Sequence, residues 1–298
     1  MNKEELFEKI KSEISDQISF LEDKPEETID STIKALWLKA AGISKSSEEA
    51  AKSHLLDLSE DQIMALDKLI EQRLDNVPLA YITGRQSFMG IELLCDNRAL
   101  IPRKETEILG RTALEVCKSI SKIKDNPLIF DICCGSGNLG LALSVLSPNI
   151  AVFSSDLSQA AVDLANENIL FLNLANRVTV LQGDLFEPFE SHKFLNQVDI
   201  IACNPPYISS AKVSKMNIEI ADNEPVMAFD GGMIGTKIIQ QLIKEAPRFL
   251  VKGGHLIFEV GLGQGSFISQ LCEKTGAYEK VSTVNDQAGN IRVIHCVF

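Results

Sequence analysis

The chain has 298 residues, of which 45% are apolar, enough for the core of one large domain or of two modest ones. Its formal net charge of −12 and its pI of about 4.9 argue against a protein that grips DNA or RNA, because phosphate contacts need a basic surface. The negative charge is compatible with binding to a basic protein partner.

The cysteines and the first residues bear on the compartment. The 7 cysteines form no C-x-x-C pair and the 4 histidines are scattered, so we predict free thiols in a reducing compartment and no metal site. The charged N-terminus has no apolar signal region behind it, and no apolar run approaches the ~18 residues of a membrane span. We expect a soluble cytoplasmic protein that does not contact membranes.

Residues 1–76 have helical periodicity throughout. Apolar residues recur at helical spacing, and helix caps are predicted at Asp30-Ser31 and at 57–59. The segment holds 10 Lys and Arg against 18 Asp and Glu. Such charges usually form a solvated helical face, although a docking module for a basic protein surface is the functional alternative. We predict a separate helical domain over 1–76.

The rest of the chain predicts a connector and an α/β domain. Residues 77–105 are expected to form a connector with a hairpin, and a helix is expected from about Thr106 to Ser121. From residue 128 strands and helices alternate, which is typical of a parallel α/β sheet. We predict one domain over 106–298, with strands at 128–133, 150–155, 178–182, 198–203 and 255–260, a closing pair at 278–284 and 291–297, and helices at 139–146, 159–172, 236–250 and 266–275.

A glycine turn follows the first of these strands. In Cys133-Cys134-Gly135-Ser136-Gly137, glycine lets the backbone approach a ligand, and the next helix offers free N–H groups. Ligands of open parallel sheets lie at the carboxyl ends of the strands, where Asp156 and Asp184 follow the next two. We predict that Asp156 accepts ribose hydroxyls and that Asp184 lies near an adenine amino group.

The cofactor class is not fixed by the turn alone. Gly135, Gly137 and Gly140 match G-x-G-x-x-G literally, so a nicotinamide dinucleotide must be weighed. The acids at the ends of the second and third strands, together with the motif that ends the fourth, fit a nucleoside better. An adenosine-type cofactor is therefore favoured.

The motif Asn204-Pro205-Pro206-Tyr207 ends the fourth strand. Two prolines fix two φ angles and remove two backbone donors, so the strand stops there, and Asn204 is held extended by the proline that follows it. The Asn204 side-chain oxygen and the Pro205 carbonyl can each accept one hydrogen of a planar NH2 group, on which Tyr207 can pack. A proline turn that merely ends a core strand is the alternative.

These residues resemble class I S-adenosylmethionine-dependent methyltransferases and, among them, the HemK/PrmC family of protein-glutamine N5-methyltransferases of peptide chain release factors. The resemblance covers nearly the whole chain. Its pieces are 78–84, 100–103 with 105–107, 204–208, the block 224–235, 253–259 and 292–293.

The resemblance implies a Rossmann-like, mixed seven-stranded sheet with a small N-terminal helical domain that helps dock a release factor, whose Gly-Gly-Gln glutamine would be methylated. A monomer is favoured, and no direct nucleic-acid contact is expected. The glutamine would be held by Asn204, Pro205, Pro206 and Tyr207. The S-adenosylmethionine contacts would fall on Asp131, Cys133, Cys134, Gly135, Ser136, Gly137, Asp156, Asp184, Leu185 and Asn204.

Two departures from the family pattern keep other acceptors open. Lys104 stands where the family usually has proline, and Cys133-Cys134 stand where it usually has glycine and a small polar residue. The alternatives are a paralogue that N-methylates a small molecule or another protein, a nucleic-acid base methyltransferase, which the acidic charge disfavours, and a cofactor-binding scaffold, which would not need the Asn204 motif.

Overall fold

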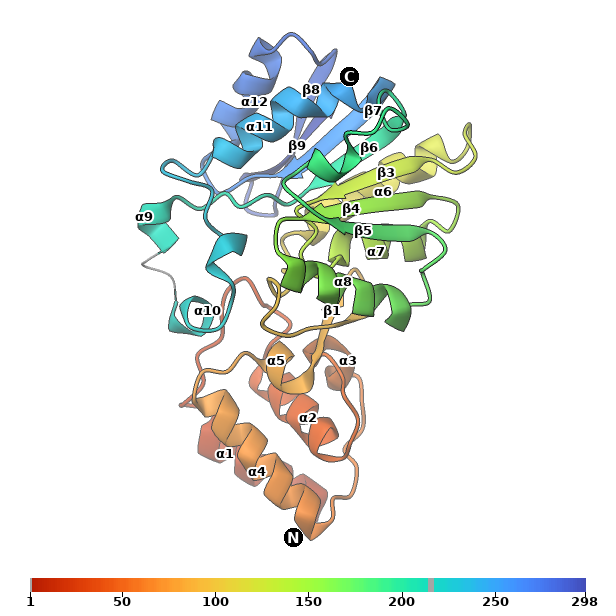
Figure 1. Cartoon of the computed structure of the whole chain (residues 1–298). Coiled ribbons are helices and arrows are strands. Elements are labelled where there is room, and N and C mark those ends of the chain that lie inside the picture. The colour runs from red at the N-terminus through yellow and green to blue at the C-terminus, as the bar shows by residue number, and fades with distance from the viewer. Residues whose placement is uncertain (1, 214–216) are drawn as a thin grey trace. The chain divides into compact units, whose positions relative to one another are not determined.

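The computed structural model describes residues 2–213 and 217–298 and divides into two compact units (Figure 1). The first unit comprises Met1–Asn97, Ile101–Lys104 and Asn217–Glu224; the second comprises Arg98–Leu100, Glu105–Met216 and Pro225–Phe298. The pattern of the sequence predicts 217–224 within the α/β domain, but by compactness these residues belong to the first unit. No helix in the described ranges is long and apolar enough to cross a membrane.

The first unit is helical except for one hairpin. Thr28 caps the second helix in a reciprocal capping box with Ser31, two positions before the predicted cap, and Ser59 caps the fourth helix. Gly84, at φ +71°, ends the short fifth helix and leads into the hairpin. The elements are α1 Lys3–Ile14, α2 Ile29–Ala40, α3 Ser47–Ala51, α4 Glu60–Leu74, α5 Leu79–Thr83, β1 Arg85–Phe88, β2 Ile91–Leu94 and α10 Ile218–Ala221.

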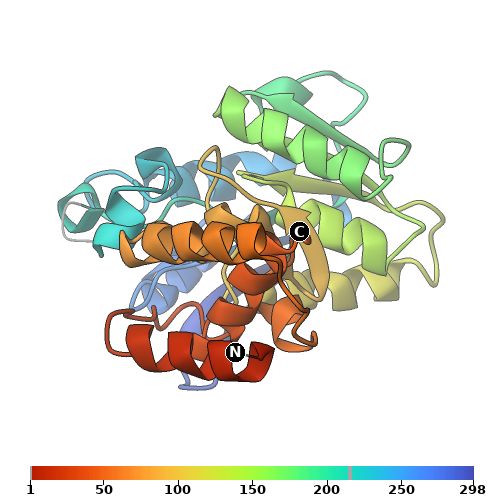
Figure 2. The same ribbon diagram turned by 90° about the horizontal axis from the view of Figure 1, so that it is seen from below.

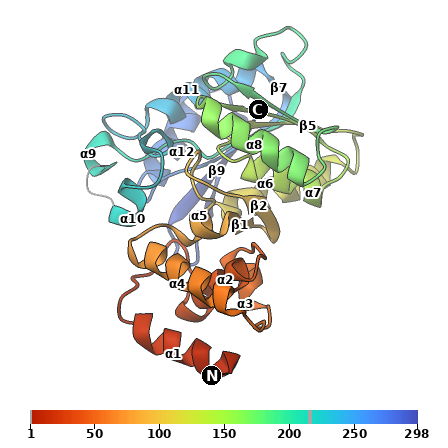
Figure 3. The ribbon, with the colours of Figure 1, turned by 60° about the horizontal axis from the view of Figure 1, so that its bottom comes forward.

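Helix α2 is the centre of this unit. It contacts α1, α3, α4 and α5 (Figure 3). Its Trp37, the only tryptophan of the chain, is fully buried and donates its indole N–H to the Leu56 carbonyl at 2.9 Å. The amphipathic helices predicted from the sequence therefore bury their apolar faces around α2.

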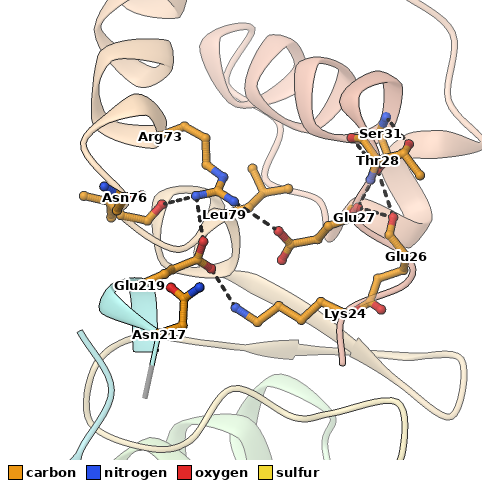
Figure 4. A network of polar contacts seen from close by, with 12 residues as sticks. Lys24, Glu26, Glu27, Thr28, Ser31, Arg73, Asn76, Leu79, Asn217 and Glu219 are labelled. Carbon is orange, nitrogen blue, oxygen red and sulfur yellow. Dashed lines mark hydrogen bonds and ion pairs between the residues drawn. The ribbon is translucent and has the colours of Figure 1, made fainter. Parts of the chain in front are cut away.

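Within the first unit, a buried ionic network joins α10 to α4 and to the segment before α2 (Figure 4). Glu219 accepts from Lys24 Nζ at 2.9 Å and from Arg73 at 3.0 Å, and Arg73 also lies 3.7 Å from a carboxylate oxygen of Glu27. All four side chains are buried. A second buried pair joins Arg103 to Glu224. Charges removed from water are tolerated only when they are paired in this way, so residues 217–224 are fixed within the first unit.

The second unit is built on a seven-stranded mixed sheet with the order β5-β4-β3-β6-β7-β9-β8. Strands β3 to β7 are parallel, and β9 pairs antiparallel with both β7 and β8. The central strands are almost wholly buried, as expected of parallel strands covered on both faces. The strands are β3 Leu128–Ile132, β4 Ala151–Asp156, β5 Val178–Gln182, β6 Val198–Cys203, β7 Leu250–Glu259, β8 Lys280–Asn285 and β9 Ile291–Val297.

Helices cover both faces of this sheet. Helices α6, α7 and α8 pack on one face, and α8 lies alongside β4 and β5 (Figure 2). Helices α11 and α12 cover the other face, where their apolar residues join a core that contains Phe130, Ile201 and Phe258. The helices are α6 Glu107–Ile120, α7 Asn138–Leu146, α8 Gln159–Phe171, α9 Ser210–Val213, α11 Lys237–Glu245 and α12 Gly265–Lys274, with short 3-10 turns at Glu187–Phe189, Val226–Ala228 and Ala246–Arg248.

The predicted helix over 236–250 is wrong in its last five residues. Helix α11 ends at Glu245 because Pro247 cannot continue the hydrogen-bonding pattern, and β7 already begins at Leu250. Gly253 and Gly254 lie inside β7. Opposite them, between Val198 and Ile200 of β6, the pairing register of β6 with β7 shifts. Both bond to Phe298, so they form an irregularity in the strand and do not stop a helix.

The strand order places a switch point between β3 and β6. The chain runs from β3 outward through β4 to β5, then returns to β6 on the other side of β3. Ile132 pairs with Cys203, so the residues that follow these two strands leave the sheet side by side. In open parallel sheets this crevice at the carboxyl ends is where ligands bind.

Candidate functional site

The turn after β3 is formed by three residues in the left-handed region: Cys133 at φ +59°, Gly135 at +54° and Gly137 at +81°. The turn is closed by the Gly137 N–H, which donates to the Cys134 carbonyl at 2.8 Å. A Cβ on Gly137 would meet Leu141 and Ala165 at 3.0–3.3 Å. Glycine is therefore required at Gly137 by both its backbone and its neighbours.

Asp156, the last residue of β4, is tied to this turn. Its Oδ2 accepts from the Gly135 N–H at 2.8 Å and its Oδ1 accepts from the Ser158 N–H at 2.9 Å. Burial raises its pKa, and these backbone hydrogen bonds oppose the shift. A carboxylate can accept about four hydrogen bonds, so Asp156 keeps acceptor capacity for a further donor.

Asp131 lies beneath the turn and is 1% exposed. Its Oδ2 accepts from the Gly140 N–H in the first turn of α7 at 2.8 Å, and a Cβ on Gly140 would lie 2.9 Å from that oxygen. Burial raises the pKa of this carboxyl to about 7. Asp131 therefore links β3 to the first turn of α7 below the turn that follows β3.

Ser136 is also buried, and among the described residues its hydroxyl has no hydrogen-bond partner. Its carbonyl accepts from Asn168 Nδ2 at 3.1 Å, which anchors the turn to α8. A buried hydroxyl without a partner is costly, so a polar ligand group over this turn would satisfy it.

The segment after β5 lies beside the end of β4. The Gly183 N–H donates to the Asp156 carbonyl at 3.0 Å, and the buried Leu185, at φ +45°, accepts from Ser155 Oγ at 2.6 Å. Asp184 is exposed, and its N–H lies 3.3 Å from Glu187 Oε2. The residues predicted for an adenosine therefore gather along one edge of the sheet.

The Asn204-Pro205-Pro206-Tyr207 elbow leaves β6 at the same edge. The half-buried Asn204 donates from Nδ2 to Thr106 Oγ1 at 3.2 Å. Within the described residues, neither the Asn204 side-chain oxygen nor the Pro205 carbonyl accepts a hydrogen bond. Two acceptors at the carboxyl end of β6 thus remain open to a donor from a ligand.

The Tyr207 hydroxyl enters a buried charged cluster. It donates to Glu259 Oε1 at 2.8 Å and lies 3.3 Å from Glu105 Oε1, while Arg292 bonds Glu105 at 2.7 Å and Glu259 at 3.4 Å. Burial and the two carboxylates hold the pKa of Tyr207 well above its ordinary value. Burial, helped by Glu105, raises the pKa of Glu259 to about 7. The ring is therefore fixed by its hydroxyl and stays neutral.

Glycines surround the backbone of the elbow. A Cβ on Gly231 would lie 2.6 Å from the Pro206 carbonyl oxygen, and one on Gly235 would overlap the Tyr207 carbonyl. Gln264 donates to that Tyr207 carbonyl at 2.9 Å. Only residues without a side chain leave room for this packing, so the loops after residues 230 and 260 hold the elbow in shape.

The structure places the sequence-predicted site residues at the carboxyl edge of the sheet, except for Asp131, which lies below it. Asp184 lies at this edge with its side chain exposed. The supporting side chains Thr106, Glu259, Arg292 and Gln264 were given no role from the sequence. For the first three, the available signal was their position within the blocks that resemble the family.

The comparisons with known proteins agree with this architecture. Residues 118–224 match the family model of the methyltransferase small domain, and residues 15–84 match that of the PrmC N-terminal domain. A methyltransferase structure from Pyrococcus furiosus is similar over 78% of this chain and 98% of its own, with a TM-score of 0.51 and 16% identity. The fold is that of the Rossmann-like class I methyltransferases, with a small N-terminal helical domain.

Proteins that are similar in sequence show which family of methyltransferases the chain belongs to. A release factor glutamine methyltransferase of Thermodesulfovibrio yellowstonii is 35% identical over 80% of this chain and 82% of its own length. One from Rhodopirellula baltica is 33% identical over 79% and 78%. The chain belongs to the family of release factor glutamine methyltransferases.

Proposed function

We propose that this protein transfers a methyl group from S-adenosylmethionine to the side-chain amide nitrogen of a glutamine in a release factor, the glutamine of its Gly-Gly-Gln motif. The observation that carries the proposal is the position of the Asn204 elbow beside the glycine turn after β3. Family membership supports the same reaction.

The residues at the turn fit this cofactor. Asp156 keeps acceptor capacity for a ribose hydroxyl, and the Ser136 hydroxyl lacks a partner among the described residues. Leu185 and Asp184 lie at the adjacent strand end. Asp156 would hold the ribose, and Cys133 to Gly137 would line the amino-acid part of the cofactor. S-adenosylmethionine, when bound, supplies a methyl group on a positively charged sulfur that leaves as a neutral thioether.

The elbow recognises a primary amide by its two hydrogens. The side-chain oxygen of Asn204 and the carbonyl of Pro205 each accept one N–H, and the Tyr207 ring packs on the plane of the amide. A carboxylate at the same place would bring lone pairs against these acceptors, so glutamine is favoured over glutamate.

The same two hydrogen bonds serve the reaction. An amide nitrogen is a weak nucleophile because its lone pair is delocalised, and it becomes positively charged as the N–C bond forms. Acceptors fixed at its hydrogens stabilise that charge and orient the lone pair. The nitrogen afterwards releases its extra proton to water, so no strong base is required.

The test is methyl transfer to a purified release factor from labelled S-adenosylmethionine, with the product located by mass spectrometry. We expect the label on the Gly-Gly-Gln glutamine and none on a release factor with alanine there. Asn204→Ala should lower turnover by roughly 10²–10³ while leaving the fold intact. Asn166→Ala, on the surface of α8, is the control. Tight cofactor binding without transfer to any release factor would move the acceptor elsewhere.

A further inference from the structure

The end of β7 and the start of β9 bring two buried side chains of opposite charge to the Tyr207 hydroxyl. Glu259 is the last residue of β7 and pairs with Val293 of β9, so Arg292 lies next to it at the carboxyl edge of the sheet. The Val260 N–H closes this corner by donating to the Arg292 carbonyl at 2.9 Å. The backbone of the sheet therefore fixes the positions of both charged residues.

Arg292 is a cation that two carboxylates share. Its Nη2 lies 2.7 Å from Glu105 Oε2 and 3.4 Å from Glu259 Oε1. The Tyr207 hydroxyl donates to Glu259 at 2.8 Å, and Glu105 Oε1 lies 3.3 Å from the same hydroxyl. Without the guanidinium, two carboxylates of like charge would face one hydroxyl, and they would separate or one of them would take up a proton. Arg292 therefore keeps both acceptors in place around the hydroxyl.

These charged residues hold the hydroxyl end of the Tyr207 ring. The backbone of Tyr207 is held separately, because its carbonyl accepts from Gln264 Nε2 at 2.9 Å. A Cβ on Gly261 would lie 3.0 Å from Cδ2 of the ring, so the backbone of this loop supports one ring edge. Hydrogen bonds to a charged group are among the strong ones in proteins. Losing the one at the hydroxyl would therefore let the ring tilt while the backbone of the elbow stays in place.

We propose that Arg292 is a positioning residue for methyl transfer, which holds Glu259 and Glu105 at the Tyr207 hydroxyl and so sets the plane of the ring. The inference rests on the proposed function, in which the acceptor amide packs on this ring. A tilted ring would leave the amide nitrogen off the line to the methyl group. Loss of Arg292 should therefore lower turnover and leave cofactor binding unchanged.

The first experiment is a double-mutant cycle on kcat for methyl transfer to a release factor. Arg292→Met and Tyr207→Phe should each lower kcat by roughly 10- to 100-fold. The double variant should be no slower than the slower single variant, because both changes remove the same anchor of the ring. Arg248→Met is the control, since Arg248 forms an exposed pair with Glu190. Effects that multiply in the double variant, or full kcat in either single variant, would overturn the inference and leave the proposed function intact.

A lysine variant and the cofactor affinity distinguish positioning from a general loss of structure. Both contacts of Arg292 with the carboxylates come from one nitrogen, so an ammonium group can replace them. We expect Arg292→Lys to recover kcat to within a few-fold of the wild type, and S-adenosylhomocysteine affinity to be the same in all these variants. A lysine variant as slow as Arg292→Met, or parallel losses of kcat and cofactor affinity, would leave Arg292 a purely structural role.

A measurement without substrate separates the two proposals. The chain has 3 tyrosines, so enzyme labelled with ¹³Cζ-tyrosine gives a simple spectrum in which Tyr207→Phe assigns the Tyr207 signal. Because the Cζ shift reports the hydrogen bonds of the hydroxyl, this signal should move in Arg292→Met and not in Arg248→Met. If the wild-type enzyme methylates no release factor, the proposed function fails, and the signal still decides whether Arg292 holds the hydroxyl. An unmoved Tyr207 signal in Arg292→Met refutes the inference.

Discussion

The carboxylate of Asp156 accepts a hydrogen bond from the backbone N–H of Gly135 at 2.8 Å. This bond joins the end of β4 to the turn after β3, across the strand pair that flanks the switch point. Asp156 is therefore held in one orientation in the absence of a ligand, and its remaining lone pairs point in a fixed direction.

Asp156→Ala should weaken binding of S-adenosylhomocysteine by roughly 10- to 100-fold, because hydrogen bonds to a charged group contribute about 1.5–3 kcal/mol. Titration calorimetry measures the affinity. Asp163→Ala, which removes an exposed carboxylate from α8, is the control and should change nothing. An Asp156→Ala affinity equal to that of the control would refute the ribose role.

Gly235→Ala should impair turnover without impairing cofactor binding. The added Cβ would overlap the Tyr207 carbonyl and force the elbow to move, and misplacement of about 1 Å in a reacting group can cost 10²-fold. Gly232→Ala is the matched control. Gly232 also has a positive φ, +88°, but its Cβ would meet only Lys237 at 3.4 Å.

Steady-state methyl transfer and S-adenosylhomocysteine affinity are measured for both glycine variants. Both carry the backbone strain of alanine at positive φ, so the difference between them isolates the collision with the elbow. Equal kcat in the two variants would show that the loop at residue 235 does not hold the elbow.

Glu27 makes the first unit less stable as the pH rises. Burial raises its pKa from 4.5 to about 7 in the folded chain. Between these values the folded state binds a proton that the unfolded state lacks, so the free energy of unfolding falls as the pH rises, by up to about 3 kcal/mol, and the loss is complete above the folded pKa.

Urea unfolding followed by Trp37 fluorescence tests this, since the only tryptophan reports on the first unit alone. Glu27→Gln should flatten the decline between pH 4.5 and 7, whereas Glu22→Gln, which changes an exposed residue, should leave it unchanged. A decline of the same size in Glu27→Gln would assign the pH dependence to other groups.

Local patterns predict most of the elements, and long-range pairing explains what they miss. The strand β6 was placed at 198–203 from its apolar run and the prolines that follow it, and the structure agrees. Residues 217–224 could not be assigned in this way. Glu219 resembles a solvated charge until Lys24 and Arg73, which lie 195 and 146 positions earlier, bury and neutralise it. No window along the sequence contains such a pair.

The residues of the site divide in the same way, into local motifs and residues that the fold brings together. The Asn204 elbow and the glycine turn are contiguous motifs whose backbone chemistry can be worked out from the residues themselves. Thr106 bonds Asn204 of the elbow, and Arg292 bonds Glu259, which holds the Tyr207 hydroxyl. These partners lie in distant segments, so they become visible only when the sheet and α6 bring them together. The chemistry of the reaction was therefore predictable, and the side chains that orient it were not.

Cys133 tests how the turn tolerates a side chain where the family usually has glycine. Its backbone has φ +59°, a region that costs a residue with a Cβ roughly 1–2 kcal/mol and a β-branched residue more. The free energy of unfolding of Cys133→Val should therefore be about 1–2 kcal/mol lower than that of Cys133→Ala, although both variants lack the thiol. Cys133→Gly should be the least strained. Circular dichroism follows unfolding of both units, whereas Trp37 fluorescence follows the first unit alone and should be identical in all three, so the difference between the two probes isolates the second unit. Equal stability of the valine and alanine variants would mean that the turn relaxes to another conformation.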